Sequence, residues 1–134
     1  MRFIPTVFHG IADYVVGVLV IALPFLLALE GNVRGITIAL GAFVLLYSLM
    51  TDYELGVVRF LRIRFHLLLD ALFGAGMLVL PFVLEIPAAS RWPFYLIGVL
   101  ALLLAATTRI RAEGTAAPGN HNVNPGSRRE GDIR

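Results

Sequence analysis

Four long apolar segments dominate this chain of 134 residues, and they restrict it to folds that can lie within a lipid bilayer. Crossing about 30 Å of hydrocarbon takes about 20 helical residues, and an α-helix satisfies its own backbone polar groups there. Charged residues make up only 15% of the chain, whereas about 25% is usual in soluble domains. The sequence therefore predicts an all-α membrane protein with four transmembrane helices, at residues 8–29, 36–51, 65–86 and 92–108.

The first and third segments carry the same polar and turn-forming residues at an offset of 57 positions. The sequence is FHGIADYVVGVLVIALPFLLAL at residues 8–29 and FHLLLDALFGAGMLVLPFVLEI at residues 65–86. The same offset aligns the second segment with the fourth, including Thr51 with Thr108. Chance explains matches between apolar residues, but it does not explain repeated His, Asp, Pro and Arg. We therefore expect a duplicated helical hairpin.

The two copies should enter the membrane in the same direction, because each contains an even number of spans. Such copies form a parallel repeat, related by a pseudo-two-fold axis along the membrane normal. The expected organisation is a first hairpin at 1–55, an Arg-rich connector at 56–64, a second hairpin at 65–111 and a tail at 112–134. The tail is rich in Gly, Pro, Asn and charged residues, so we expect it to be disordered.

The arginines indicate how the chain is oriented in the membrane. Only Arg2 precedes the first segment and Asp13 lies within it, so that segment should be a retained span and not a cleaved signal peptide. A four-span topology then places nine arginines on one side and only Arg34 and Arg91 on the other. The positive-inside rule predicts that both termini face the cytoplasm, here at a bacterial inner membrane. The arginines expected to contact lipid headgroups are Arg59, Arg62, Arg64, Arg109 and Arg111.

The hairpins resemble those of bacterial SPW-repeat integral membrane proteins. The residues that carry the resemblance are Pro24-Phe25 with Gly41 and Pro81-Phe82 with Gly98, and the similarity extends over residues 8–108. Leu-Pro-Phe stands in both copies where that family has Ser-Pro-Trp. The resemblance implies an integral membrane hairpin and implies no particular activity.

Two stripes of polar residues are the candidate site. His9, Asp13 and Gly17 are spaced at i, i+4 and i+8, so they share one helical face, and the repeat places His66, Asp70 and Gly74 in the same way. The favoured interpretation is structural, with the His/Asp pairs packing the two repeats, because buried ionisable groups need partners. Proton or small-ion transport is an alternative, and a metal or haem site formed by both pairs is a second alternative.

The remaining features predict packing and not chemistry. Gly17, Gly74, Gly41 and Gly98 are candidates for close helix contacts, with Gly17 and Gly74 expected where the repeats meet. Pro24 and Pro81 are expected to kink their helices. The chain has no cysteine and no recognisable nucleophile arrangement, so we expect no enzyme activity and predict no cofactor. The expected partners are the bilayer and either a second copy or another membrane protein; nucleic acid is not expected.

Overall fold

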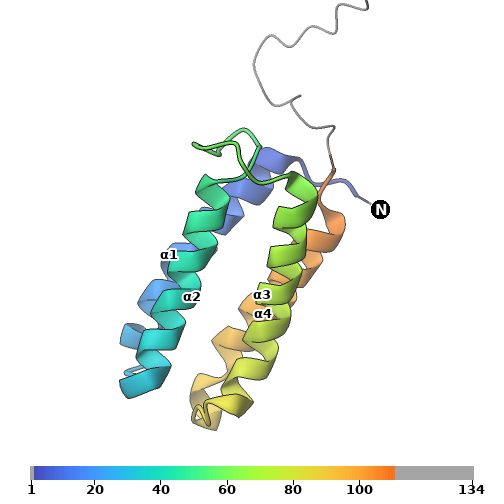
Figure 1. Ribbon diagram of the computed structural model, residues 1–134. Coiled ribbons are helices and arrows are strands. Elements are labelled where there is room, and N and C mark those ends of the chain that lie inside the picture. Colours follow the sequence, from blue (N-terminus) through green and yellow to red (C-terminus); the bar gives the residue numbers. More distant parts are fainter. Residues whose placement is uncertain (1, 111–134) are drawn as a thin grey trace, which may run out of the picture.

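The computed structural model describes residues 2–110, and helices account for most of them (Figure 1). Among these residues there are four α-helices and a short 3₁₀ turn, η1 (Ala88–Ser90), and no strand. Each α-helix, with η1 counted as part of the last, is long and apolar enough to cross a membrane, which confirms the all-helical prediction. The predicted tail at 112–134 and Arg111 lie outside the described residues. The helices are α1 (Thr6–Leu26), α2 (Gly31–Leu49), α3 (Ile63–Val83) and α4 (Trp92–Thr107).

Helices α1 and α3 end three residues earlier than the apolar pattern indicates, at Leu26 and Val83. A left-handed residue, Ala28 or Glu85, follows each helix with φ of 52°. The chain then turns back, and Leu29 N–H donates to the Pro24 carbonyl at 2.7 Å. The pattern missed these ends because apolarity reports burial and not helicity: Leu29 is only 7% exposed although it lies beyond the helix.

The helices pair into an N-terminal hairpin, α1 with α2, and a C-terminal hairpin, α3 with α4 (Figure 1). Backbone contact is close within each hairpin and sparse between the two. A methyl group added at Gly41 would lie 2.6 Å from the carbonyl oxygen of Gly17, and one at Gly98 would lie 2.8 Å from that of Gly74. The glycines therefore bring together the helices of one hairpin. The expectation that Gly17 and Gly74 lie between the repeats was wrong, because those glycines face their own hairpin partners.

The outer surface of the bundle is apolar, as a surface facing lipid must be. Phe8, Leu26 and Phe82 are each more than half exposed. The interior is apolar too, and it is formed mainly by residues of all four helices: Val20, Leu23, Leu29, Val44, Tyr47, Phe73, Met77, Ile86, Phe94 and Ile97.

Short extended segments tie the two hairpins together at the end of the bundle that carries the N-terminus and the α2–α3 connector, called here the connector end (Figure 1). The N–H groups of Phe3 and Ile4 donate to the Thr107 carbonyl at 2.8 and 3.1 Å, and Arg109 N–H donates to the Ile4 carbonyl at 2.9 Å. The equivalent residues of the other half, at the offset of 57 positions, form the same three bonds. The N–H groups of Phe60 and Leu61 donate to the Met50 carbonyl, and Asp52 N–H donates to the Leu61 carbonyl.

Candidate functional site

Four buried polar side chains meet between the hairpins near the connector end. His9 and Asp13 come from the first two turns of α1, and His66 and Asp70 come from the first two turns of α3. The histidines are fully buried, and the aspartates are 5% and 4% exposed. We call these four residues the quartet.

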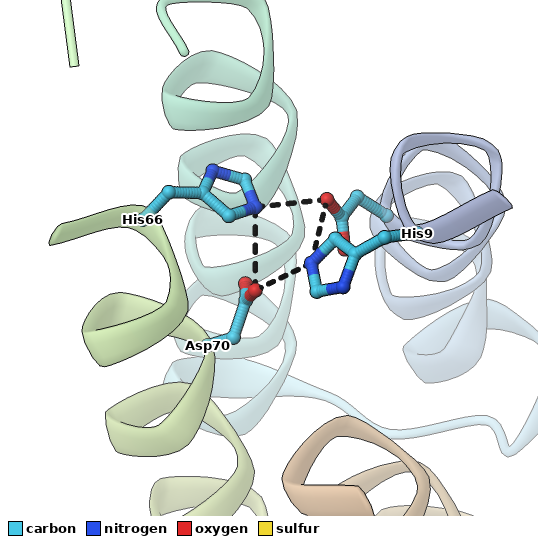
Figure 2. Close-up of side chains that lie close together, drawn as sticks. His9, His66 and Asp70 are labelled. Atoms are coloured by element: carbon cyan, nitrogen blue, oxygen red, sulfur yellow. Dashed lines mark hydrogen bonds and ion pairs between the residues drawn. The ribbon is translucent and has the colours of Figure 1, made fainter. Parts of the chain in front are cut away.

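The quartet forms a closed ring in which histidine and aspartate alternate (Figure 2). The shortest contacts join different hairpins, at 2.7 Å from His9 Nε2 to Asp70 Oδ2 and 2.9 Å from His66 Nε2 to Asp13 Oδ2. The contacts within one helix are longer, at 3.3 Å in α1 and 3.2 Å in α3. The sequence predicted that each pair shares a helical face, and the structure adds that the two faces meet.

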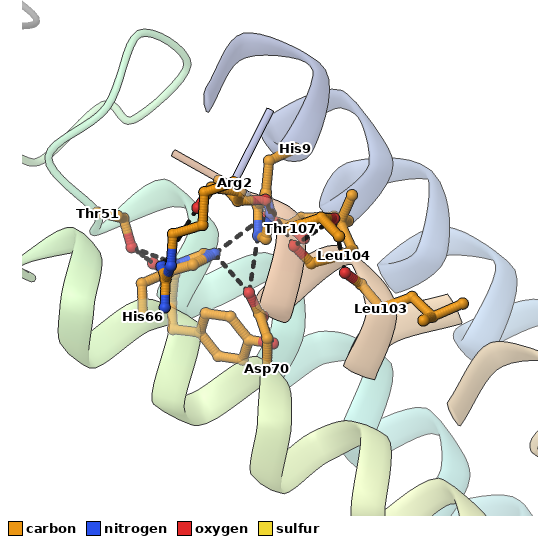
Figure 3. Close-up of polar contacts among 11 residues, drawn as sticks. Arg2, His9, Thr51, His66, Asp70, Leu103, Leu104 and Thr107 are labelled. Carbon is orange, nitrogen blue, oxygen red and sulfur yellow. Dashed lines mark hydrogen bonds and ion pairs between the residues drawn. The ribbon is translucent and has the colours of Figure 1, made fainter. Parts of the chain in front are cut away.

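A threonine at the end of a neighbouring helix holds the other nitrogen of each histidine, and Figure 3 shows Thr51 beside His66. Thr51 Oγ1 lies 2.7 Å from His66 Nδ1, and Thr108 Oγ1 lies 2.6 Å from His9 Nδ1. Each hydroxyl already donates its single hydrogen to a backbone carbonyl four residues earlier, at 2.6 and 2.7 Å. It can therefore only accept from the histidine, so both Nδ1 atoms carry a hydrogen and donate it.

The hydrogens at Nδ1 leave both Nε2 atoms directed at carboxylate oxygens. A contact of 2.7–2.9 Å between two such acceptors requires a hydrogen between them. Each His–Asp pair between the hairpins therefore shares one proton, either as imidazolium with carboxylate or as neutral imidazole with carboxylic acid. In both states the ring is electrically neutral, which lowers the cost of burying it in an apolar bundle.

Tyr47 distinguishes the two aspartates. Its hydroxyl donates to Asp70 Oδ1 at 2.7 Å, and its ring packs edge-on against His66 with centroids 5.0 Å apart. The position 57 residues later is Leu104, which has no hydroxyl to offer Asp13. Asp70 is therefore held on both of its oxygens, by Tyr47 and by the histidines.

A residue of the connector covers the quartet. The centroids of the Tyr53 and His66 rings lie 5.5 Å apart, and Tyr53 is 1% exposed. Gly10 leaves the space for this ring, because a methyl group there would collide with it. Burial raises the pKa of the Tyr53 hydroxyl, so this side chain stays uncharged beside the quartet.

A cavity of about 210 Å³ adjoins the quartet between the hairpins. Asp13, Asp70 and Tyr47 contribute to its wall. Apolar side chains form the rest: Ala12, Val16, Val44, Phe73, Leu100, Ala101 and Leu104.

The predicted headgroup arginines lie away from the quartet. Arg59 is 4.0 Å from Asp52, and Arg62, Arg64 and Arg109 are exposed. Their contact with lipid stays a prediction. At the opposite end of the bundle, Arg34 and Arg91 donate from Nε to the chain just after a helix: Arg34 to the Leu29 carbonyl at 2.8 Å and Arg91 to the Ile86 carbonyl at 2.6 Å.

Sequence reasoning found the four ring residues but missed three that orient them. Thr51 and Thr108 were visible as a pair conserved between the two halves, and nothing in the sequence connected them with the histidines. Tyr47 has no counterpart in the other half and so gave no signal. The prolines lie in the last turns of α1 and α3, and a kink at them stays a prediction.

No protein-family model matches the chain, and neither does any curated protein or solved structure. Among residues 2–110, the quartet is the group of His, Asp and Glu side chains whose ligand atoms lie close enough to share an ion, all within 4.8 Å of one another.

Proposed function

We propose that this protein is a small integral protein of a bacterial inner membrane, with a non-enzymatic structural or accessory role. Two parallel hairpin repeats form its body, both termini face the cytoplasm, and the quartet fastens one hairpin to the other. The observation that carries this proposal is the exchange of partners, since the shortest bond of each histidine goes to the aspartate of the other hairpin.

The distribution of contacts supports the fastening role. Because backbone contact between the hairpins is sparse, the polar ring is a specific link between them. Leaving any one of its members without a partner would bury an unsatisfied polar or charged group, which costs about 1–3 kcal/mol or more. Separated hairpins are therefore disfavoured, and so is any register in which the histidines miss the aspartates.

The duplication is supported by bonds that recur at the same offset. The contact between His9 and Thr108 corresponds to the contact between His66 and Thr51, because each residue is replaced by its equivalent in the other half. The backbone bonds at the connector end correspond in the same way. We also propose that the hairpins are similar to those of SPW-repeat membrane proteins.

Transport of protons or small ions has weaker support. The ring could exchange protons, but the cavity beside it is walled mostly by aliphatic and aromatic side chains. Beyond Asp13, Asp70 and Tyr47, that wall offers no side chain that would replace the water around an ion.

A double-mutant cycle on His9 and Asp70 tests the fastening role. The variants are His9→Ala, Asp70→Ala and the double variant, unfolded reversibly in mixed micelles with a chelator present. If the bond between hairpins stabilises the fold, the pair should show a coupling energy of about 0.5–2 kcal/mol. His9 with Asp52, a carboxylate outside the quartet, is the control pair and should be additive. Additivity for His9 and Asp70 as well would reject the proposal.

A further inference from the structure

We propose that the quartet is a binding site for one divalent transition-metal ion, with Zn²⁺ the ion that its ligands suit best. The ligand atoms would be Nε2 of His9 and His66 and one carboxylate oxygen each of Asp13 and Asp70. This inference rests on the proposed function, because the same four residues join the hairpins, and it adds that a metal ion can hold them together.

The spacing of the four atoms is that of a coordination shell. In a tetrahedral zinc site with bonds of about 2.0–2.1 Å, neighbouring ligand atoms lie about 3.3 Å apart. The two contacts within a helix are already 3.3 and 3.2 Å long. The two contacts between hairpins are 2.7 and 2.9 Å, which is the length of a hydrogen bond. An ion at the centre would take the place of those two shared hydrogens, with shifts of a few tenths of an ångström along the contacts around the ring. The opposite ligand atoms, which lie within 4.8 Å of each other, would move closer together to reach the tetrahedral spacing.

The orienting residues are those that a metal site requires. A histidine that binds a metal usually donates its other ring N–H to an oxygen acceptor, which fixes the tautomer and directs the free lone pair. Thr51 and Thr108 accept from Nδ1 in this way, so both Nε2 lone pairs face the centre of the ring. Ligating carboxylates are in turn hydrogen-bonded, and Tyr47 supplies that bond to Asp70. A plain ion-pair lock needs neither a fixed tautomer nor all four atoms converging on one point.

The charges also agree with a divalent ion. Two carboxylates neutralise one dication, so the loaded site would have no net charge in its apolar surroundings. Imidazole and carboxylate together suit zinc and other first-row divalent ions better than calcium or magnesium, which prefer oxygen ligands alone. Haem does not suit the geometry, because a porphyrin would have to lie between the two histidines, where oxygens of Asp13 and Asp70 already contact both Nε2 atoms.

Zinc titration of the full-length protein tests the site. The protein should be purified in detergent without a histidine tag, stripped with a chelator, and titrated with Zn²⁺ alone in a His121→Ala background, since His121 is the remaining histidine. We expect one zinc per chain and a higher thermal midpoint. X-ray absorption at the zinc edge should show four nitrogen or oxygen ligands at about 2.0–2.1 Å, with scattering from two imidazole rings.

The informative variant is Asp13→Asn with Asp70→Asn. An asparagine amide can donate to a neutral Nε2, so the ring keeps its hydrogen bonds while both anionic ligands are lost. We expect zinc affinity to fall at least tenfold with folding retained, whereas the control Asp52→Asn should bind as the unsubstituted protein does. Equal binding by the asparagine variant would show adventitious zinc and overturn the proposal. The absorption measurement uses no quartet variant, so it decides the question even if that variant does not fold.

The zinc titration and the double-mutant cycle together distinguish the metal site from the fastening role. Absence of stoichiometric zinc together with coupling between His9 and Asp70 in chelator would reject the metal site and leave the fastening role. If neither stoichiometric zinc nor coupling were found, the metal site and the fastening role would both be rejected.

Discussion

Replacing Thr51 by valine would remove one hydroxyl from beneath the quartet with almost no change in shape. Thr51 is fully buried, and its oxygen accepts from His66 Nδ1 at 2.7 Å. Valine fills the same volume with a methyl group, so the Nδ1–H group would remain buried without an acceptor. The substitution also removes the hydroxyl that donates to the Tyr47 carbonyl at 2.6 Å. At Thr108 the corresponding Leu104 carbonyl keeps a backbone N–H donor.

The size of the effect follows from the burial of both partners. A buried donor left unsatisfied costs about 1–3 kcal/mol. His66 is 0% exposed, and water cannot replace the lost acceptor without entering the bundle. We therefore expect about 2 kcal/mol, which corresponds to roughly a thirtyfold lower ratio of folded to unfolded protein. Thr108→Val should cost a similar amount, because Thr108 accepts from His9 in the same way.

Reversible unfolding in mixed micelles would measure these differences against two controls. Thr107→Val removes a hydroxyl that donates to the Leu103 carbonyl at 2.6 Å and touches no histidine, so its effect should stay within about 0.5 kcal/mol. Thr51→Ser keeps the acceptor and should recover most of the stability. If Thr51→Val were no more destabilising than Thr107→Val, the assignment of hydrogens at Nδ1 would be wrong.

Three further outcomes are expected. Gly41→Ala should destabilise the protein by about 1–3 kcal/mol, because the new methyl group would lie 2.6 Å from the Gly17 carbonyl oxygen. Gly76→Ala is its control and should be neutral or stabilising by up to about 1 kcal/mol, since nothing lies within 4 Å of the added atom; equal unfolding midpoints for the two variants would contradict the packing described. Tyr47→Phe should weaken zinc binding by about 10–100-fold in the same titration, because it releases one oxygen of Asp70; unchanged affinity would count against that role. Zinc should displace the two shared protons of the quartet, so its affinity should rise with pH by up to about a hundredfold per pH unit. Calorimetry in buffers of different ionisation enthalpy would count the protons, and a count of zero would show that zinc binds elsewhere.

The sequence allowed much of the fold to be predicted, because a match at a constant offset is a signal that single residues do not give. The offset of 57 residues aligned the helices and singled out His9 and His66 with their aspartates. It also aligned Thr51 with Thr108, although their role was not visible. A residue can be conserved between two halves for its place in the fold or for its chemistry, and only the structure showed that both hydroxyls lie against a histidine.

What the sequence could not supply was the direction in which each helix faces. In a soluble protein the polar side of a helix identifies the face that turns outward, but these helices are apolar on nearly every side. The exposed Phe8 and the buried Val20 are both apolar. The same difficulty led to the wrong assignment of Gly17 and Gly74 to the contact between repeats, since a glycine marks a close approach without identifying the neighbour.

The exchange of partners between hairpins has a consequence for how such a protein can change over time. Each half carries one histidine, one aspartate and one threonine, so two identical hairpins would complete the same ring as an isologous pair. In such a dimer every substitution would appear in both hairpins at once. With both hairpins in one chain, each side can vary alone. Tyr47 donates its hydroxyl hydrogen to Asp70, whereas the corresponding position beside Asp13 is Leu104, which has no hydroxyl. A fused pair can therefore give two symmetric carboxylates different affinities for a proton, which a pair of identical hairpins cannot do.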